Sequence, residues 1–252
     1  MNAVKKIIYN HVIPSIGRLL VGKNRYVNVI YYHDIVKGEG DSFMRTNVDL
    51  FKKQMTYIAA NGYKTLRFED LNDPENLKFH SKTVLISFDD GWKSNYEILD
   101  FMRSNGLKYN IFLTLQEIGN NPDYLSWEQV KEMYASGVVG FGAHTYTHPS
   151  MKEIGKIDPQ LEFDKANAVF EEHMGFAPED FCYPFGYFSA ESNEYVATKT
   201  SYKRIYTSQY TYSYPLHDRI VFGRCGISNN ETFGVFKAKL NGYFNCWKIL
   251  VH

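Results

Sequence analysis

The sequence predicts an α/β protein whose strands form a largely parallel sheet, either closed as a barrel or open as a layer. Short runs of apolar, β-branched and aromatic residues alternate along the chain with segments of helical periodicity. One run, residues 84–88, is apolar at almost every position, which is typical of a strand buried on both faces of a parallel sheet. No linker or repeat divides the chain, so we expect one domain over residues 27–252 after an N-terminal segment of residues 1–26.

In chain order, the first expected strand is the Val, Ile and Tyr run of residues 27–32. Apolar residues then recur at helical spacing over residues 51–58, and an Asn-Gly pair ends that helix. After the strand 84–88, a second helix with apolar spacing over residues 98–102 also ends at Asn-Gly, and residues 109–113 form the next strand.

The second half of the chain continues this alternation. Residues 126–129 read Ser-Trp-Glu-Gln, the spacing of a capping box, and open a helix that ends at Gly137. The strand 138–143 follows, and a helical segment comes later that contains residues 161–170. The remaining elements are a helix, two strands and a final helix, expected at residues 194–199, 203–207, 219–222 and 232–240.

The composition excludes some function classes and leaves others open. The 28 Lys and Arg residues balance the 28 Asp and Glu residues, which argues against a general nucleic-acid coat or a polybasic membrane binder. Three cysteines without Cys-x-x-Cys spacing favour a reducing compartment over a disulfide scaffold. Aromatic residues reach 16%, with 20 Tyr, and such rings suit sugar ligands, although ordinary packing explains the same composition.

The N-terminal segment begins like a targeting sequence, because two lysines precede Ile7 and Ile8. Polar residues and Pro14 interrupt the apolar run before it reaches the length of a signal-peptide core or a membrane span, so we expect a cytoplasmic protein. We expect the segment to be a first helix packed on the domain. The alternative is an amphipathic stretch that makes peripheral contact with an anionic membrane.

Residues able to do chemistry follow directly after expected strands. They form four groups: His33-Asp34, Asp89-Asp90, His144 with His148, and the turn Tyr183-Pro184-Phe185-Gly186. The loops at the carboxyl ends of parallel strands converge on one face of an α/β protein. We therefore expect the four groups to share one site.

Two of these groups together indicate a metal site. Asp89 and Asp90 at the end of a buried strand would repel each other without a cation, and a metal ligand beside a general base meets that need. His144 and His148 are four residues apart, within reach of one ion, and Thr145 occupies the position where a zincin has Glu. Helix capping by Asp-Gly and an ordinary surface His pair are the alternatives.

Five segments resemble the motifs of one enzyme family. Residues 87–91 (Ser-Phe-Asp-Asp-Gly) and 144–149 (His-Thr-Tyr-Thr-His-Pro) are similar to the first and second motifs of the polysaccharide deacetylase family, also called the NodB-homology or carbohydrate esterase 4 group. Residues 181–186 resemble its third motif. Residues 31–35 and 125–130 resemble the branch that contains the poly-N-acetylglucosamine deacetylases.

This resemblance implies a single-domain distorted (β/α)7 barrel with one divalent metal ion, for which Zn²⁺ is expected and Co²⁺ or Ni²⁺ are alternatives. Carried over by position, Asp90, His144 and His148 would hold the ion, and Asp89 would be the general base that activates water. The backbone N–H of Phe185 would be a further donor to the oxyanion.

The resemblance also implies an acid and a substrate surface. His33 is expected to protonate the leaving amine, and His217 is its rival. Cys182 stands where the third motif elsewhere has an Arg that orients the catalytic Asp. Its expected replacements are Arg204, Arg219 and Arg224. Substrate contacts are expected from Tyr183, Pro184 and Tyr187. Independently of the resemblance, Tyr187 and four further rings near or after the third motif are candidates for stacking on a sugar, with core packing as the alternative: Phe188, Tyr210, Tyr212 and Tyr214.

The function implied is a metal-dependent hydrolase that removes acetyl groups from N-acetylated amino sugars. The substrate would be a cell-surface polysaccharide or its lipid-linked or nucleotide-linked precursor. An O-acetyl esterase or another C–N amide hydrolase is the alternative within the same chemistry. A catalytically silent carbohydrate-binding protein is the alternative from another class, although a base, metal ligands and an acid serve no purpose in it.

Overall fold

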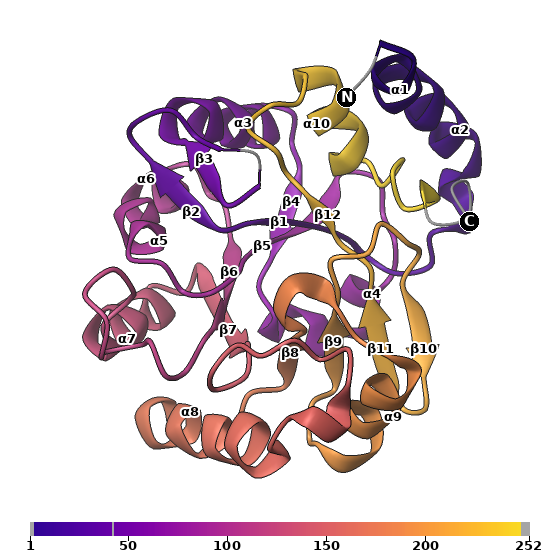
Figure 1. The fold of residues 1–252 in the computed structure, drawn as a ribbon. Helices are drawn as coiled ribbons and strands as arrows, with labels where there is room; N and C mark the ends of the chain where they lie inside the picture. Colours follow the sequence, from indigo (N-terminus) through magenta and orange to yellow (C-terminus); the bar gives the residue numbers. More distant parts are fainter. Residues whose placement is uncertain (1–2, 42, 248–252) are drawn as a thin grey trace.

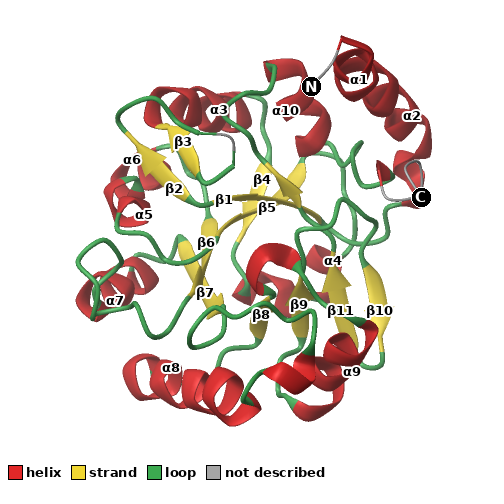
Figure 2. Cartoon of the chain, viewed as in Figure 1, coloured by secondary structure: helices red, strands yellow, loops and turns green. Residues whose placement is uncertain are grey.

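A mostly parallel sheet runs through the centre of the molecule, with helices around it (Figures 1 and 2). The computed structural model describes residues 3–41 and 43–247. The hydrogen-bonded order of the main sheet is β10-β11-β9-β8-β7-β6-β5-β1-β12, and β4 pairs with β5. Its strands are β1 Asn28–Tyr32, β4 Lys64–Leu66, β5 Thr83–Phe88, β6 Tyr109–Leu113, β7 Val139–Ala143, β8 Asp180–Cys182, β9 Arg204–Tyr206, β10 Tyr214–Leu216, β11 Arg219–Phe222 and β12 Cys225–Gly226.

The two ends of this sheet are joined by one short stretch of chain. β11 pairs in parallel with β9, and β12, which begins only three residues later, pairs in parallel with β1. Between them Arg224 N–H donates to Gln209 C=O at 3.1 Å, and just after β12 Ile227 N–H donates to Tyr31 C=O at 3.0 Å. The segment 219–227 therefore runs from one edge of the sheet to the other. Because β11 and β12 are separate strands that do not pair with each other, the barrel is distorted.

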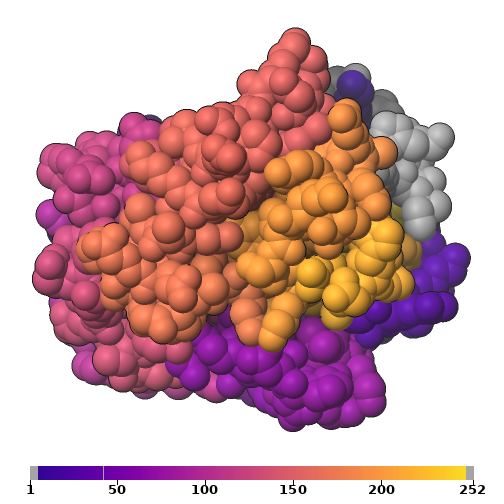
Figure 3. Space-filling model, turned by 90° about the horizontal axis from the view of Figure 1, so that it is seen from below, coloured from indigo at the N-terminus to yellow at the C-terminus, as the bar shows by residue number. Residues whose placement is uncertain are grey.

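The helices cover the outside of the sheet. They are α1 Ala3–Ile7, α2 Ile13–Leu20, α3 Val48–Ala60, α4 Pro74–Leu77, α5 Ser94–Glu97, α6 Leu99–Ser104, α7 Trp127–Ala135, α8 Ala166–Met174, α9 Ala190–Lys199 and α10 Phe233–Leu240. π-helical turns at Ile8–Val12 and Gln160–Lys165 lead into α2 and α8. Seen from below, the segment that carries α8 and α9 occupies the middle of the surface, and N-terminal residues lie at its margin (Figure 3).

Two apolar clusters hold these layers together. The larger one fills the space between the strands and the helices and includes Phe51, Ile86 and Phe170. A smaller one lies on the inner side of the sheet, where residues such as Leu85 and Phe112 from different strands meet. Since successive strand residues point to opposite faces, this division between an outer and an inner cluster is what a barrel-like sheet requires.

The expected α/β class is confirmed, and most expected strands and helices form near their predicted positions. The capping box at the start of α7 is present, with Ser126 and Gln129 bonded to each other's backbone N–H. The structure adds β2 Asp34–Val36 and β3 Arg45–Asn47, a separate parallel pair, as well as β4, β10, β12 and α4. These elements are too short for periodicity to reveal them.

The N-terminal helices pack on the C-terminal part of the domain. The ring of Tyr9 lies 5.1 Å from Phe244 and 5.7 Å from Trp247, and Ile13 is buried in the larger cluster. A side chain at Gly17 would collide with the backbone of Tyr243, so a close approach requires glycine here. Among the described residues, no helix is long and apolar enough to span a bilayer.

Candidate active site

The four predicted groups of polar residues lie together where the parallel strands end. His33 follows β1, Asp89 and Asp90 follow β5, and His144 follows β7. The turn Pro184–Gly186 follows β8. Because neighbouring parallel strands present their carboxyl ends on the same side, the topology alone brings these residues to one mouth.

Asp90, His144 and His148 converge on a single point. Asp90 Oδ1 is 3.6 Å from His144 Nε2 and 3.4 Å from His148 Nε2, and the two Nε2 atoms are 3.2 Å apart. Asp90 and His144 are buried, and His148 is partly exposed. Two imidazole nitrogens and one carboxylate oxygen on one side leave the other coordination positions open, as in hydrolytic metal sites.

Neighbouring groups orient the three side chains toward that point. His144 Nδ1 lies 2.7 Å from the carbonyl of Cys182, so Nδ1–H donates there and the lone pair of Nε2 faces the cluster. Trp92 Nε1–H donates to Asp90 Oδ2 at 3.0 Å, which leaves Oδ1 for the shared point. Burial lowers the pKa of His144 to about 4, so the imidazole is neutral, which is the form that binds metal.

The backbone of the site adopts unusual conformations. Asp90, Thr145, His148 and Phe185 all have positive φ, between 57° and 75°. Such left-handed conformations are costly for residues other than glycine and persist where the surroundings impose them. The buried Glu162 supplies part of that constraint, because its carboxylate accepts the N–H groups of the loop at Tyr146 and Thr147.

The donor set fits a divalent ion better at this cluster than at a neighbouring one. Asp89, His144 and Cys182 also lie close enough together to share an ion. However, both oxygens of Asp89 are already bonded to the guanidinium of Arg224, and a cation there would face a fixed positive charge. The Asp90, His144 and His148 set has no such competitor among the described residues.

Asp89 is held by a buried arginine. Arg224 Nη1–H and Nη2–H donate to the two carboxylate oxygens of Asp89, each at 2.7 Å. Burial alone would raise the pKa of Asp89, but the charge and hydrogen bonds of Arg224 overcome it and hold that pKa well below its usual range. Asp89 is therefore ionised at neutral pH, beside the cluster that Asp90 belongs to.

Of the three arginines expected to replace the third-motif Arg at Cys182, Arg224 is the one that reaches Asp89. Its Nη2–H also donates to Cys182 Sγ at 2.9 Å. Arg204 instead pairs with Asp180 at 2.7 Å, and Arg219 bonds backbone carbonyls of α9 and the residue that follows it. No local sequence signal distinguishes them, because Arg224 meets Asp89 from 135 positions away in the chain.

The two candidate acids occupy opposite ends of the sheet. His33 Nε2 is 3.9 Å from Asp89 Oδ2, and its side chain is only 13% exposed. His217 lies in the turn before β11, at the amino end of the parallel strands, and its Nε2 is 2.9 Å from a carboxylate oxygen of Glu194. Of the two, the structure brings only His33 next to Asp89.

The third-motif turn divides into an exposed and a buried part. Phe185 and Tyr187 are 58% and 50% exposed, and the Phe185 ring lies 4.6 Å from the ring of His148. Tyr183 and Pro184 are buried, and Tyr183 stacks on Phe188 at 4.9 Å. The side chains of Tyr183 and Pro184 thus pack inward, and of the three predicted substrate-binding residues only Tyr187 is exposed, so substrate binding by this turn stays a prediction.

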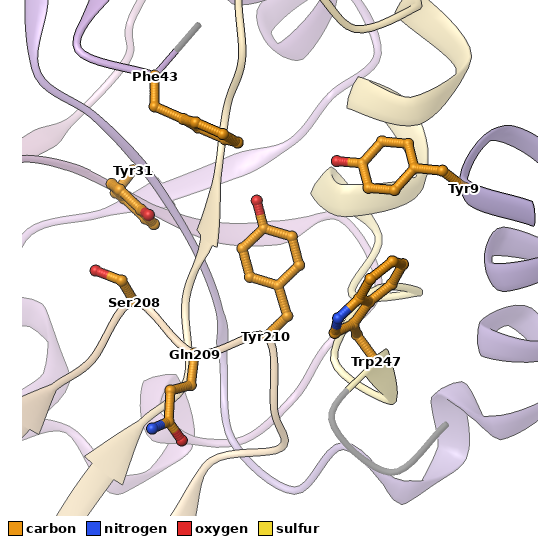
Figure 4. A pocket seen from close by; sticks show the side chains of 7 residues that line it. All are labelled: Tyr9, Tyr31, Phe43, Ser208, Gln209, Tyr210 and Trp247. Atoms are coloured by element: carbon orange, nitrogen blue, oxygen red, sulfur yellow. The ribbon is translucent and has the colours of Figure 1, made fainter. Parts of the chain in front are cut away.

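A pocket adjoins the site on the side of Tyr31. Its volume is about 490 Å³. Aromatic rings and the two polar side chains of Ser208 and Gln209 line it; the rings are those of Tyr9, Tyr31, Phe43, Tyr210 and Trp247. Figure 4 shows Tyr9 and Trp247 on one side of Tyr210, with Tyr31 and Phe43 on the other. The Tyr31 ring also covers the guanidinium of Arg224 at 4.4 Å, so pocket and site share a wall.

Of the other predicted stacking rings, only Tyr210 lines this pocket. Tyr212 donates its O–H to the carbonyl of Leu20, and Tyr214 is bonded to Asn193. Phe188 packs against Tyr183, as described above. These three rings support the fold around the site, while Tyr210 faces the pocket.

The fold and the site define an α/β protein with a His, His and Asp cluster at the carboxyl ends of its parallel strands. The family model of the polysaccharide deacetylases matches residues 76–205, more than half of the chain. The chain therefore belongs to the polysaccharide deacetylase family. The match includes Asp89, Asp90, His144 and His148, whereas His33 and Arg224 lie outside it.

Two curated proteins are similar to this chain. YxkH of Bacillus subtilis, whose name assigns it to the polysaccharide deacetylases, is 28% identical over 184 residues, 72% of this chain and 64% of YxkH. The poly-β-1,6-N-acetyl-D-glucosamine N-deacetylase of Staphylococcus epidermidis is 29% identical over 112 residues, 42% of this chain and 39% of that protein. The chain thus spans less than two thirds of the length of either relative.

A solved structure supports the fold. The polysaccharide deacetylase BC0361 from Bacillus cereus superposes with a TM-score of 0.72 at 22% identity, covering 86% of this chain and 69% of that one. At this identity the likeness concerns the fold alone. It agrees with the expected distorted barrel, although the hydrogen-bonded sheet is interrupted between β11 and β12.

Proposed function

We propose that this protein is a metal-dependent hydrolase that removes acetyl groups from N-acetylated amino sugars. One observation supports it above the others: a His, His and Asp cluster lies directly beside a carboxylate that Arg224 keeps ionised. A binding protein gains nothing from a buried charged group of this kind, since desolvating it costs free energy. Membership of the deacetylase family supports the same chemistry.

Asp90, His144 and His148 would hold the ion, most simply Zn²⁺. When bound, the ion supplies a Lewis acid that polarises the acetyl carbonyl and lowers the pKa of water. Asp89 then accepts the proton of the attacking water. Arg224 acts through Asp89, because its two hydrogen bonds fix the direction of the carboxylate and keep it ionised until it takes up that proton.

The remaining roles fall to His33 and the third-motif turn. His33, close to Asp89, protonates the nitrogen of the departing amino sugar, so that an amine and acetate are released. The backbone N–H of Phe185 donates to the oxyanion as the tetrahedral carbon forms. Its positive φ turns this peptide away from the direction of an ordinary strand.

The substrate class follows from the surfaces around the site. Phe185 and Tyr187 form an exposed aromatic rim, and the pocket next to Tyr31 combines rings with the polar Ser208 and Gln209. Sugar rings present apolar faces and hydroxyl edges, which such walls match without a charged group. An N-acetylglucosamine polymer or its lipid-linked or nucleotide-linked precursor is the proposed substrate, in keeping with the name of the Staphylococcus epidermidis relative.

The test is acetate release from N-acetylglucosamine monomers and oligomers by protein treated with a chelator and then given Zn²⁺, Co²⁺ or Ni²⁺. We expect activity only with metal, and none in an Asp89→Asn variant of the same metal content. Acetate release from O-acetylated sugars alone would favour the esterase. Glycan binding by a metal-loaded protein without any acetate release would favour the silent binding protein.

A further inference from the structure

The exposed apolar side chains of this protein are concentrated in one region. Eight large ones are exposed in the described part of the chain, and two of them, Phe185 and Tyr187, belong to the rim of the site. The other six come from the N-terminal helices and the loop after β2: Ile7, Ile8, Val12, Leu19, Phe43 and Met44. The largest exposed fraction, 85%, is that of Leu19.

The N-terminal helices present two different apolar faces. Ile13 and Gly17 lie on the face that packs on the domain. Ile8, Val12 and Leu19 are spaced by four and seven residues, which places them on a common side of a helical segment, and all three are exposed. The face with Ile13 and Gly17 is sufficient to pack the helices on the domain. The exposed face with Ile8, Val12 and Leu19 is therefore available to a partner.

The charge of this region is unlike that of the rest of the chain. Residues 1–33 contain five of the 28 basic residues and none of the 28 acidic ones, which leaves 23 basic and 28 acidic residues in the remainder. The five are all exposed: Lys5, Lys6, Arg18, Lys23 and Arg25. The zero net charge of the protein thus hides a positive N-terminal region on an otherwise acidic body.

We propose that the exposed face of residues 5–20 binds the surface of a bilayer that contains anionic phospholipid. Apolar side chains flanked by Lys and Arg are the combination that inserts at the boundary between headgroups and acyl chains. Phe43 lies next to the helices, because it lines a second cavity together with Lys6 and Tyr9, and it extends the same apolar surface. Figure 1 shows α1 and α2 at the edge of the molecule, where a flat surface can reach them.

The charge selects a membrane over other partners. A second copy of this chain would bring five basic residues against five, which like-charge repulsion opposes. A bilayer with phosphatidylglycerol supplies both the negative surface and the apolar interior that the face needs. The inference does not depend on the proposed catalysis, because the face lies outside the cluster of Asp90, His144 and His148.

The experiment is sedimentation of the whole protein with sucrose-loaded vesicles. The vesicles contain either phosphatidylcholine alone or phosphatidylcholine with about 30% phosphatidylglycerol. We expect the protein to sediment with the anionic vesicles only. Leu19→Asp and, independently, Val12→Asp should each weaken binding about tenfold or more, since a charge then replaces an inserting side chain. The double variant Lys5→Gln, Arg18→Gln should weaken it about 30-fold, at about 1 kcal/mol per basic residue.

The matched control is Lys131→Gln, Lys199→Gln, which removes two exposed lysines from α7 and α9. It should bind like the unaltered protein, and circular dichroism should show every variant folded. The proposal is overturned if the unaltered protein stays in the supernatant, if it binds both vesicle types equally, or if both Asp variants still sediment. A dimer in solution that Leu19→Asp separates would also overturn it, in favour of a second copy of the chain.

Discussion

Asp89 and Asp90 are neighbours in the sequence, yet the two sides of the site treat their charges differently. On the inner side, Asp89 is bonded to Arg224, a permanent cation that belongs to the fold. On the outer side, Asp90 faces the imidazoles of His144 and His148, the group that we propose holds an exchangeable cation. The difference teaches that one buried negative charge can be fixed by folding while the adjacent one is left for a ligand to neutralise.

The largest test of this comparison replaces each carboxylate by its isosteric amide. Asp89→Asn and Asp90→Asn should both lower kcat/KM by about 10³-fold or more, since one removes the base and the other a metal ligand. Only Asp90→Asn should weaken metal binding, by about 100-fold, measured by competition with a chromophoric chelator. Equal metal affinities in the two variants would mean that the carboxylates do not have separate roles.

A second test addresses the inner side through stability. Arg224→Met leaves Asp89 buried without its partner and should lower the free energy of unfolding by about 3–5 kcal/mol in urea titrations. The matched Arg219→Met, at a partly exposed arginine, should cost about 1 kcal/mol or less. The double variant Arg224→Met, Asp89→Asn should recover part of the loss, and no recovery would contradict the pairing.

A third test addresses the outer side through ligand linkage. Zn²⁺ at 100 times its dissociation constant should raise the free energy of unfolding by about 2.7 kcal/mol, measured by thermal shift. His148→Ala should abolish most of this stabilisation, because it removes one of the three ligands without emptying the core. An unchanged thermal shift in that variant would locate the ion elsewhere.

The smallest expected effect concerns the acid. His33→Ala should lower kcat by about 100-fold with intact metal content, since a positioned acid contributes factors of this order. His217→Ala, at the other end of the sheet, should leave kcat within about twofold. If His217→Ala alone lost turnover while keeping its metal, the assignment of His33 would be abandoned.

Much of the site could be predicted because its residues follow strands directly. Asp89, Asp90 and His144 each come straight after a run of apolar residues, so their common position follows from strand polarity alone. His148 is fixed by its spacing to His144. Predicting the position of these residues required only local sequence patterns and the rule that parallel strands end on the same side of the sheet.

The remaining parts depend on contacts that are distant in the chain. Arg224 was one of three equal candidates in the sequence, because only the bend between β11 and β12 brings its side chain to Asp89. Tyr183 looked available for substrate, but its ring is drawn into the packing between the sheet and α9. The aromatic pocket joins Tyr9 and Trp247 from the two ends of the described chain, a contact that periodicity cannot reveal.

The bent segment that runs between the two edges of the sheet also links local opening to the site. Only a few amide hydrogen bonds, including those of Arg224 and Ile227, hold this seam between β9 and β1. Fluctuations that open the seam expose these amides to exchange with solvent while the rest of the fold stays intact. Since the side chain of Arg224 holds Asp89, we expect opening of this segment to release that carboxylate, and the exchange rates of the two amide protons to report how often it happens.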